Sequence, residues 1–223
     1  THINVVSEGF QSYFEKYPDA TYTVFPNGID PDFLDHSAQL DRTKETGSPL
    51  VTVYAGNIGQ GQGLHRIIPE TAHRLGDGYE FWIIGDGGAR ALLEAEVHRL
   101  NLSNVIIRDP VDRSQLVSIY RDADVLFLHL NDFTAFRRVL PSKIFELATV
   151  DRPILAGVSG YAAEFLRREV PGSMVFEPCD ADALTDLLRK IPGTAVPHRS
   201  GFLQKYSRSR IDNDMAQSIL RVL

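Results

Sequence analysis

The stretch FTAFRRVLPSKIFELA brings two arginines, a lysine and a glutamate together within ten residues. Ser142 stands before a short amphipathic run, so we expect it to cap a helix by accepting a hydrogen bond from a first-turn amide. The amino-terminal end of a helix favours anions, and Arg137, Arg138 and Lys143 would add charged donors around it. Glu146 lies one turn further on, on the same face as the lysine, where its carboxylate could accept from two ribose hydroxyls. The stretch indicates a site for a phosphate and a ribose, and a solvated helix face is the alternative interpretation.

A second stretch that could approach a phosphate is the glycine-rich segment GNIGQGQG, residues 56–63. Four glycines in eight residues allow backbone amides to come close to an anion. The segment does not fit the dinucleotide fingerprint G-x-G-x-x-G, because the pattern counted from Gly59 fails at Leu64. It also lacks the G-K-[ST] triplet of a nucleoside triphosphate loop. A flexible tight turn is the alternative interpretation of this segment.

Two further loops follow predicted strands and could contribute to the same site. Gly85-Asp86-Gly87 leads directly into a predicted helix, and Asp86 could either cap that helix or contact a ligand. Residues 108–111, Arg-Asp-Pro-Val, could offer backbone groups to the edge of a base, although an ordinary connection would look the same. Ligands of an open parallel sheet bind at the carboxyl ends of its strands, so we expect these loops to converge.

Metal and nucleophile sites find little support in the sequence. The seven histidines show no paired ligand spacing, and no G-x-S-x-G elbow is present. Cys179 stands alone without an obvious base, so no internal disulfide is possible and a reducing compartment is expected. Asp122 and Asp124 precede a predicted buried strand, where a solvated turn explains them better than acid–base chemistry does. We therefore expect no metal ion and no cofactor.

The elements that must position these loops alternate between strands and helices from Leu50 onward. Continuous apolar runs predict parallel strands that are buried on both faces. The predicted strands are 51–54, 81–84, 105–107, 125–128, 153–156 and 174–176. The predicted helices are 64–75, 89–100, 113–120, one after Ser142, 161–168 and one from Asp180 or Asp182 to Lys190. This alternation predicts an α/β fold, a Rossmann-like doubly wound parallel sheet over residues 48–192.

Shorter segments flank the predicted sheet domain, so we divide the chain into residues 1–47, 48–192 and 193–223. The first segment is expected to hold strand 3–6, a helix from Ser7 to Lys16, strand 22–25, a turn at Pro26-Asn27-Gly28 and a polar linker over residues 30–49. The last segment holds one helix candidate from Gly201 to Leu223, with an apolar stripe formed by Ile211, Met215, Ile219 and Leu220.

Bulk properties restrict the classes of function. The chain has 223 residues, 43% hydrophobic and 23% charged, a composition typical of a folded globular protein rather than a disordered one. The net charge of -6 argues against nucleic acid as the main partner. The longest apolar run, residues 125–128, is too short to cross a membrane. The chain begins at Thr1 without an initiator methionine or a signal-type segment, so we expect a piece of a longer polypeptide.

Five motifs give the chain a family resemblance. They are VFPNGID at 24–30, YAGNIGQGQGL at 54–64, WIIGDGG at 82–88, DADVLFL at 122–128 and LPSKIFELA at 140–148. In this order and spacing they resemble the C-terminal half of a family 4 glycosyltransferase with the GT-B architecture, over almost the whole chain. The forms AGN-x-G-x-x-QG-L and PSK-x-FE are most similar to bacterial enzymes that build surface polysaccharide or O-antigen, including N-acetyl-L-fucosamine transferases.

The resemblance implies a nucleotide-sugar donor site on this domain and an acceptor held by an N-terminal Rossmann domain. Residues 1–25 would be the tail of that domain, and residues 201–223 the helix that returns toward it. The expected donor is a UDP-sugar, and the expected acceptor is a saccharide or a lipid-linked saccharide. The expected location is cytoplasmic, at most peripheral at the inner face of the membrane, with no transmembrane segment.

The resemblance also assigns roles to residues, with two departures from the family pattern. Glu146 matches the second glutamate of the family's E-x7-E signature, which grips the ribose, whereas Arg138 stands where the first glutamate would be. Asn57 and Gln62 stand where many family members carry Arg and Lys. We therefore expect Lys143, with Arg138 or its neighbour Arg137, to supply the positive charge at the diphosphate.

These assignments give a defined set of expected site residues. The expected catalytic residues are Arg138, Lys143 and Glu146. The expected nucleotide-sugar contacts are Gly56, Asn57, Gly59, Gln60, Gly61, Gly85, Asp86, Arg108, Pro110, Arg137, Leu140, Pro141, Ser142, Lys143 and Glu146.

The predicted function is that of the donor-binding domain of a hexosyl or N-acetylhexosaminyl transferase that retains the anomeric configuration. Departure of the leaving group places negative charge on the diphosphate, which prepositioned amides and cationic side chains stabilise without a metal. The piece alone is expected to turn over little, because the acceptor site would lie on the other half. Two alternatives stay open: a non-catalytic sugar-nucleotide-binding module, which the two departures permit, and a nicotinamide-dependent oxidoreductase domain, which the failed fingerprint disfavours.

Overall fold

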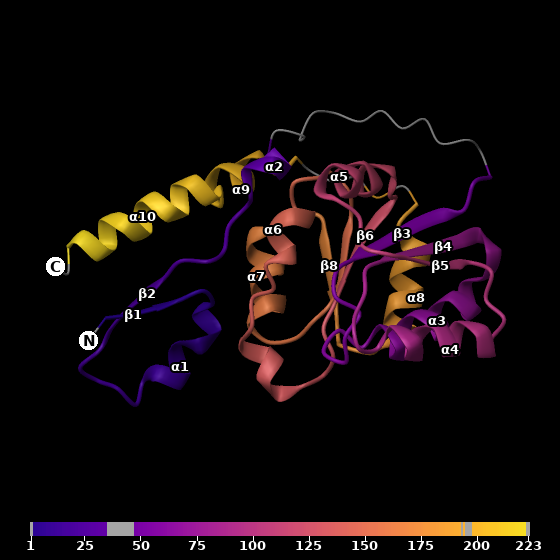
Figure 1. Cartoon of the computed structure of the whole chain (residues 1–223), viewed down its shortest axis with the longest axis horizontal. Coiled ribbons are helices and arrows are strands. Elements are labelled where there is room, and N and C mark those ends of the chain that lie inside the picture. The colour runs from indigo at the N-terminus through magenta and orange to yellow at the C-terminus, as the bar shows by residue number, and fades with distance from the viewer. Residues whose placement is uncertain (1, 35–46, 193, 195–197, 222–223) are drawn as a thin grey trace.

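A six-stranded parallel sheet forms the centre of the computed structural model, which describes residues 2–34, 47–192, 194 and 198–221 (Figure 1). The strand order is β5-β4-β3-β6-β7-β8, and every neighbouring pair is parallel. The strands are β3 (Leu50–Ala55), β4 (Tyr79–Ile84), β5 (Val105–Arg108), β6 (Val125–His129), β7 (Ile154–Gly157) and β8 (Ser173–Phe176). The predicted doubly wound α/β fold is confirmed, and the strand order reverses between β3 and β6.

Helices cover both faces of this sheet (Figure 1). One face packs against α3 (Leu64–Leu75), α4 (Arg90–Arg99) and α8 (Ala181–Lys190), and the other against α5 (Arg113–Asp122), α6 (Lys143–Leu147) and α7 (Tyr161–Glu169). Side chains alternate between the two cores along each strand, as the pleat requires. In β6, for example, Val125 and Phe127 join the first core while Leu126 and Leu128 join the second.

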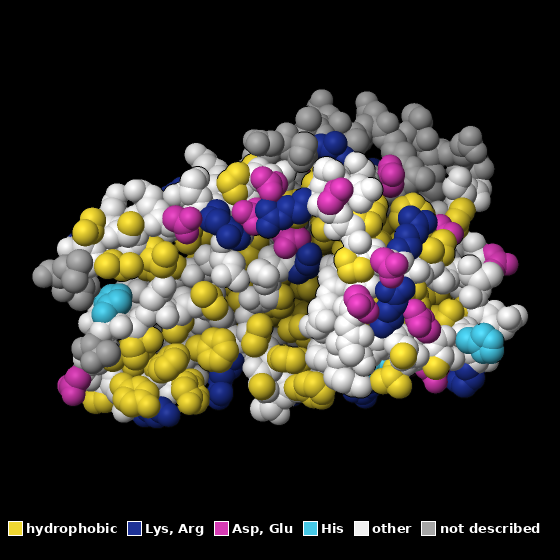
Figure 2. All heavy atoms as spheres, in the orientation of Figure 1, with side chains coloured by type: hydrophobic (Ala, Val, Ile, Leu, Met, Phe, Trp, Pro, Cys, Tyr) yellow, Lys and Arg dark blue, Asp and Glu magenta, His cyan; other side chains and the backbone are white. Residues whose placement is uncertain are grey.

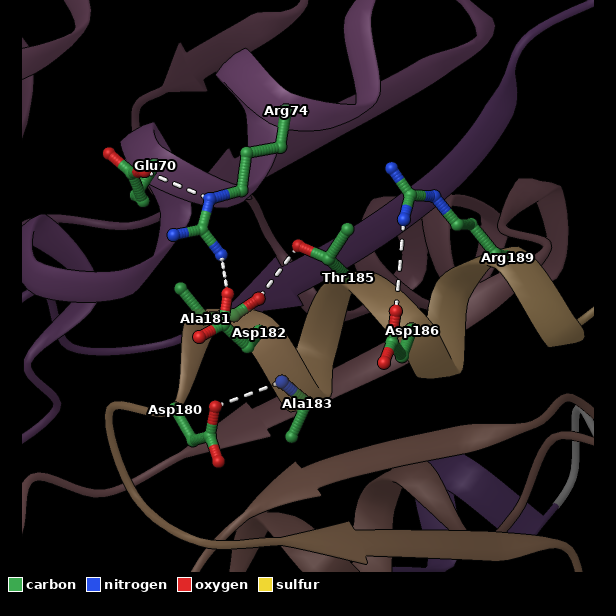
Figure 3. Close-up of polar contacts among 9 residues, drawn as sticks. All are labelled: Glu70, Arg74, Asp180, Ala181, Asp182, Ala183, Thr185, Asp186 and Arg189. Atoms are coloured by element: carbon green, nitrogen blue, oxygen red, sulfur yellow. Dashed lines mark hydrogen bonds and ion pairs between the residues drawn. The ribbon is translucent and has the colours of Figure 1, made fainter.

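Side chains at the ends of two helices explain where these helices begin. Asp180 caps α8 by accepting a hydrogen bond from the amide of Ala183 at 2.9 Å, and Asp112 caps α5 by accepting from the amide of Gln115 at 2.8 Å. Figure 3 shows the first of these caps beside Arg74 of α3, whose guanidinium pairs with Glu70 of its own helix and with Asp182 of α8. The prediction of a helix opened by Asp180 is therefore confirmed, and Asp182 instead links α8 to α3.

Two predicted serine caps are wrong. Ser7 makes no capping bond, and its hydroxyl donates instead to the carbonyl oxygen of Arg138 at 2.6 Å. The predicted helix that follows it is continuous but shorter: the 3-10 turn η1 (Glu8–Phe10) runs directly into the single turn α1 (Gln11–Phe14), which ends before the predicted Lys16. Ser142 precedes α6, but its backbone is already helical (φ -59, ψ -28) and its side chain makes no capping bond. A cap residue normally has extended backbone angles, so this serine is not placed to receive a first-turn amide.

A separate two-stranded parallel sheet, β1 (His2–Val5) with β2 (Thr21–Val24), lies on the side of α6 and α7 away from the main sheet in Figure 1. Residues 2–24 are called the N-terminal unit below. Among the described residues, three side-chain bonds join this unit to the rest of the chain: the Ser7 hydroxyl donates to the Arg138 carbonyl, the Tyr161 hydroxyl donates to Glu8 at 3.1 Å, and the Asn4 amide donates to the Met215 sulfur at 3.3 Å. The short helix α2 (Pro31–Leu34) follows β2 within the predicted linker, and the rest of that linker, residues 35–46, lies outside the described residues.

The helix predicted from Gly201 to Leu223 is two helices, α9 (Ser200–Lys205) and α10 (Arg208–Leu220). The break has a clear cause, because the backbone at Ser207 forms a parallel bridge with Ile29. The amide of Ile29 donates to the backbone carbonyl of Tyr206 at 2.7 Å, and the amide of Arg208 donates to the backbone carbonyl of Ile29 at 2.9 Å. These bonds replace the helical ones at this point.

Arg199, just before α9, is buried and donates to three backbone carbonyls, with no carboxylate of the described residues within hydrogen-bond distance. Its guanidinium reaches Pro171 at 2.8 Å, Val150 at 2.6 Å and Arg152 at 2.8 Å, so it joins the turns before β7 and β8 to the carboxyl-terminal helices. Burial lowers the pKa of Arg199 to about 10, so the side chain stays charged at neutral pH.

Hydrophobic side chains gather on the N-terminal unit, at the lower left of Figure 2. Val6, Tyr13 and Tyr17 are each about half exposed, at 48%, 49% and 50%. Within the part of the chain that the structure describes, no helix is long and apolar enough to cross a membrane.

Candidate functional site

An open cavity of about 280 Å³ lies at the carboxyl ends of β3, β4 and β5. β3 is the strand beside the point where the strand order reverses, which is where open parallel sheets bind ligands. The loops after the three strands meet here, as the sequence predicted. The lining residues are Ala55, Gly56, Asn57, Ile84, Gly85, Asp86, Pro110, Val111, Leu116 and Lys143.

The loops after β3 and β4 are in direct backbone contact beside the cavity. Gly85 has φ +149 and lies so close to the Gly56 carbonyl that a β-carbon would overlap it. A β-carbon on Gly87 would come within 2.5 Å of the Asn57 side chain. Two hydrogen bonds join the loops, from the Ile58 amide to the Asp86 carbonyl and from the Ala89 amide to the Ile58 carbonyl, both at 2.8 Å. The glycines therefore permit a close backbone approach that no other residue allows.

Lys143 supplies the positive charge among the residues that line this cavity. Ile144, Phe145 and Leu147 of α6 are buried, so the helix turns Lys143 and Glu146 toward the cavity side. Lys143 Nζ lies 2.6 Å from Glu146 Oε2, and both side chains are about a quarter exposed. The lysine stem reaches the glycine-rich loop, where its Cε lies 3.8 Å from the position of a β-carbon on Gly56. Lys143 and Glu146 therefore pair with each other across one turn of α6, and the pair lies beside the glycine-rich loop.

Asn57 and Gln62, which stand where the resembled family carries Arg and Lys, form a hydrogen bond with each other. The side-chain amide of Asn57 donates to Gln62 Oε1 at 2.8 Å, and the Gly59 amide donates to the same oxygen at 3.2 Å. These neutral bonds close the glycine-rich loop on itself. A cation for the cavity must therefore come from another element, and Lys143 is that residue among those that line it.

Three predicted site arginines lie outside the cavity lining. The Cζ of Arg138 lies 6.0 Å from the centre of the Tyr13 ring, and the Cζ of Arg108 lies 4.9 Å from the centre of the Trp82 ring. Arg137 is 61% exposed, pairs loosely with Asp132 at 3.8 Å, and lines a second open cavity of about 590 Å³ beside the N-terminal unit. Their contribution to donor binding stays a prediction.

The remaining predicted contacts divide between cavity and surroundings. Gly56, Asn57, Gly85, Asp86, Pro110 and Lys143 line the cavity. Among the described residues, its lining does not include Gly59, Gln60, Gly61, Leu140, Pro141, Ser142 and Glu146. Leu140 is 6% exposed and belongs to the core, which explains its place better than a ligand contact. Asp86 does not cap α4, because its Oδ1 accepts from the neighbouring Gly87 amide at 2.8 Å.

Sequence reasoning missed three residues of the cavity lining and one residue that supports it. Ala55 and Ile84 are the last residues of β3 and β4, and Leu116 stands in the first turns of α5. Ala55 and Ile84 could have been predicted, because ligands of an open parallel sheet bind at the carboxyl ends of its strands. Tyr54 supports the loop from below: its hydroxyl donates to the Asn57 carbonyl at 2.7 Å, and burial raises the pKa of Tyr54 far above its ordinary value, so it remains a donor.

Comparison with known proteins adds a family match. The family model "Glycosyl transferases group 1" matches residues 49–191. A curated relative, named as the colanic acid biosynthesis glycosyl transferase WcaI of Escherichia coli (strain K12), is 28% identical over 188 residues, which are 83% of this chain and 44% of that protein.

Solved structures share the fold at low sequence identity. HepE of Anabaena, in complex with UDP and glucose, superposes with a TM-score of 0.75 at 15% identity, over 97% of this chain and 62% of that one. Sucrose-phosphate synthase of Thermosynechococcus elongatus superposes with a TM-score of 0.77 at 16% identity, over 99% and 58%. HepE with UDP-glucose gives 0.77 at 15% identity, over 98% and 63%. The chain spans less than two thirds of each of these relatives.

Proposed function

Because this chain belongs to the glycosyl transferases group 1 family, we propose that it carries the nucleotide-sugar donor site of a glycosyltransferase. The proposed donor is a UDP-sugar, and the proposed transferred group is a hexosyl or N-acetylhexosaminyl residue. The proposed acceptor is a saccharide or lipid-linked saccharide of a bacterial surface polysaccharide such as O-antigen, reached by the whole protein at the inner face of the membrane. Transfer is proposed to retain the anomeric configuration.

The observation that carries this proposal is the meeting of two glycine loops and Lys143 in one cavity, with Glu146 beside it. Backbone amides and a lysine are the groups that hold a diphosphate, and a carboxylate is the group that accepts from ribose hydroxyls. Two of the solved structures that share the fold are described as complexes with UDP and with UDP-glucose. This supports a nucleotide sugar as the ligand.

Each part of the donor has a proposed place. The base would lie against Pro110, Val111 and Leu116, and the diphosphate against Gly56 and Lys143. Small-molecule pockets usually enclose about 300–1,000 Å³, and this cavity of about 280 Å³ would enclose only part of a nucleotide sugar. The sugar would therefore extend out of the cavity, where an acceptor can reach it.

The chemistry follows from the charge that develops during transfer. The bond between the anomeric carbon and the diphosphate oxygen breaks, and its electron pair moves onto the diphosphate. Lys143 and the loop amides would stabilise that charge from fixed positions, which lowers the barrier without a divalent ion. Activity of the whole protein is therefore expected to persist in excess chelator, and loss of activity there would contradict this mechanism.

Calorimetric titration of this chain with UDP and UDP-N-acetylglucosamine, without metal, tests the proposal. We expect saturable binding that weakens at least about tenfold in Glu146→Ala and in Lys143→Ala, since each loses a charge-assisted hydrogen bond. Lys190→Ala, which removes an exposed lysine at the end of α8, is the matched control and should bind like the unchanged chain. Unaltered affinity in both site variants would refute the assignment.

The same titration decides the predicted roles of Arg137 and Arg138. A loss of affinity in Arg137→Ala or Arg138→Ala would bring these side chains into the donor site, whereas no loss would restrict the charge to Lys143. Titration with NAD tests the oxidoreductase alternative. Transfer activity of the whole protein separates an enzyme from a non-catalytic sugar-nucleotide-binding module.

A further inference from the structure

Two buried polar residues at the carboxyl end of β6 hold the glycine-rich loop from behind. His129 is the last residue of β6, and Asn131 follows two positions later. Their exposed fractions are 0% and 4%, so both side chains are buried. Neither belongs to the cavity lining, and the chemistry proposed above uses neither.

Three consecutive carbonyl groups of the loop accept hydrogen bonds from these two residues. The Gln60 carbonyl accepts from Asn131 Nδ2 at 2.9 Å, and the Gly61 carbonyl accepts from the Asn131 backbone amide at 2.7 Å. The Gln62 carbonyl accepts from His129 Nδ1 at 2.6 Å. The segment from 60 to 62 is thus held at every peptide group from one side.

The orientation of both side chains is fixed by their other partners. His129 Nε2 accepts from the Cys179 amide at 2.9 Å, so the ring carries its proton on Nδ1 and donates to the loop. Asn131 Oδ1 accepts from Arg66 at 2.7 Å and from the Cys179 thiol at 3.3 Å, so its amide nitrogen must face the loop. Burial, reinforced by the nearby Arg66 charge, lowers the pKa of His129 to about 4, which keeps the ring neutral.

The carbonyls and amides of one peptide group point in opposite directions. Since the carbonyls of residues 60–62 point toward β6, the N–H groups that follow them face away from β6, and two of these three bond within the loop. The amides of Gln62 and Gly63 close the turn on the Gly59 carbonyl at 3.1 and 3.3 Å. Gly63 has φ +60, and the Asn131 side chain lies 3.2 Å from the position of a β-carbon, so the loop has little freedom to turn over.

We propose that His129 and Asn131 are positioning residues of the nucleotide-sugar site, which lock the glycine-rich loop in the closed turn that carries Asn57 to the cavity, since His129 holds the Gln62 carbonyl and the Gln62 side chain accepts from Asn57. This inference rests on the proposed function, because the loop conformation matters only if the loop holds a ligand. The two residues touch no substrate and act through the loop.

Two substitutions at one position separate this role from mere packing. His129→Asn places an amide nitrogen near the position of Nδ1 and keeps the bond to Gln62, whereas His129→Gln reaches toward Nε2 and keeps only the bond to Cys179. Both remove the ring and should lower the melting temperature similarly. We expect His129→Asn to keep its Kd for UDP within about threefold, and His129→Gln to bind at least about tenfold more weakly.

Hydrogen–deuterium exchange of the loop peptide covering residues 56–63 supplies a readout that needs no ligand. Faster loop exchange in His129→Gln than in His129→Asn is expected, and equal exchange with equal UDP affinity in the two variants would overturn the inference. Absence of UDP binding by the unchanged chain would instead overturn the proposed function, and the exchange comparison would still decide whether His129 sets the loop.

Discussion

Only glycine fits at position 85, because a β-carbon there would overlap the backbone carbonyl of Gly56 in the neighbouring loop, which cannot move aside. Gly85→Ala should therefore lower the free energy of unfolding by roughly 2–4 kcal/mol and abolish UDP binding, because the two loops would separate. Gly88→Ala is the matched control, since nothing lies within 4 Å of its β-carbon position, and it should change little. Urea unfolding and calorimetry measure both effects, and similar behaviour of the two variants would contradict the role given to the close approach.

The buried imidazole of His129 predicts a specific pH dependence of stability. Its pKa falls from the ordinary 6.5 to about 4, so between these values the unfolded chain binds a proton that the folded chain does not. The stabilisation by the neutral ring is fully present above about pH 6.5 and is lost as the pH falls toward 4, by roughly 3 kcal/mol in total. His129→Asn lacks this titration, so the difference in unfolding free energy between the two proteins should shrink across that window. A constant difference would show that the ring titrates normally.

At the scale of elements, Arg199 fixes two turns of the sheet domain to the carboxyl-terminal helices. Arg199→Met would leave three buried carbonyls without donors, so we expect the free energy of unfolding to fall by about 3–5 kcal/mol. Arg199→Lys keeps the charge but can donate to fewer carbonyls, so its free energy of unfolding should lie between those of the unchanged chain and of Arg199→Met. Arg189→Met on α8 is the control, since that side chain is 55% exposed and its ion pair with Asp186 is 3.7 Å long (Figure 3). Chemical denaturation of the three variants gives the comparison.

The sequence predicts the elements of the sheet domain well, because apolar strands and amphipathic helices alternate in it without ambiguity. Helix α3 has the predicted bounds, 64–75, and the six predicted strands all exist, each within two residues of its predicted ends. The failures lie where a distant segment competes with the local preference. Ser7 gives its hydroxyl to Arg138, and Ile29 interrupts the predicted last helix at Ser207. Neither partner is visible from local patterns.

The sequence predicts the parts of the candidate site whose position follows from the strand ends. It predicts less well the parts whose position depends on the direction of a side chain. The glycine loops and Lys143 meet because parallel strands bring their carboxyl ends together. Arg137 and Arg138 are close to Lys143 in sequence, yet η3 (Thr134–Arg138) turns them toward Asp132 and Tyr13. The predicted division of the chain at residues 47 and 192 stays a prediction.

At the scale of the molecule, the two sheets should differ in local stability. A two-stranded sheet is marginal by itself, and β1 and β2 have no third strand among the described residues. Their amides should exchange with solvent well before those of β3, β6 and β7, which lie inside the larger sheet. Hydrogen–deuterium exchange measures this directly, and Ser7→Ala should widen the gap by removing a bond between the units. Equal protection of both sheets would mean that they open as one cooperative body.

The position of Arg199 also bears on the order in which the chain is made. All six strands of the large sheet precede it, so a ribosome finishes them before this side chain exists. The last of its three acceptors, the carbonyl of Pro171, lies 28 residues earlier. At about 5–20 residues per second, that carbonyl exists for about one to six seconds before its donor is synthesised. The locking of the sheet by Arg199 therefore waits for one of the last segments of the described chain to be made, and a chain cut before residue 199 would retain the strands but lose the lock.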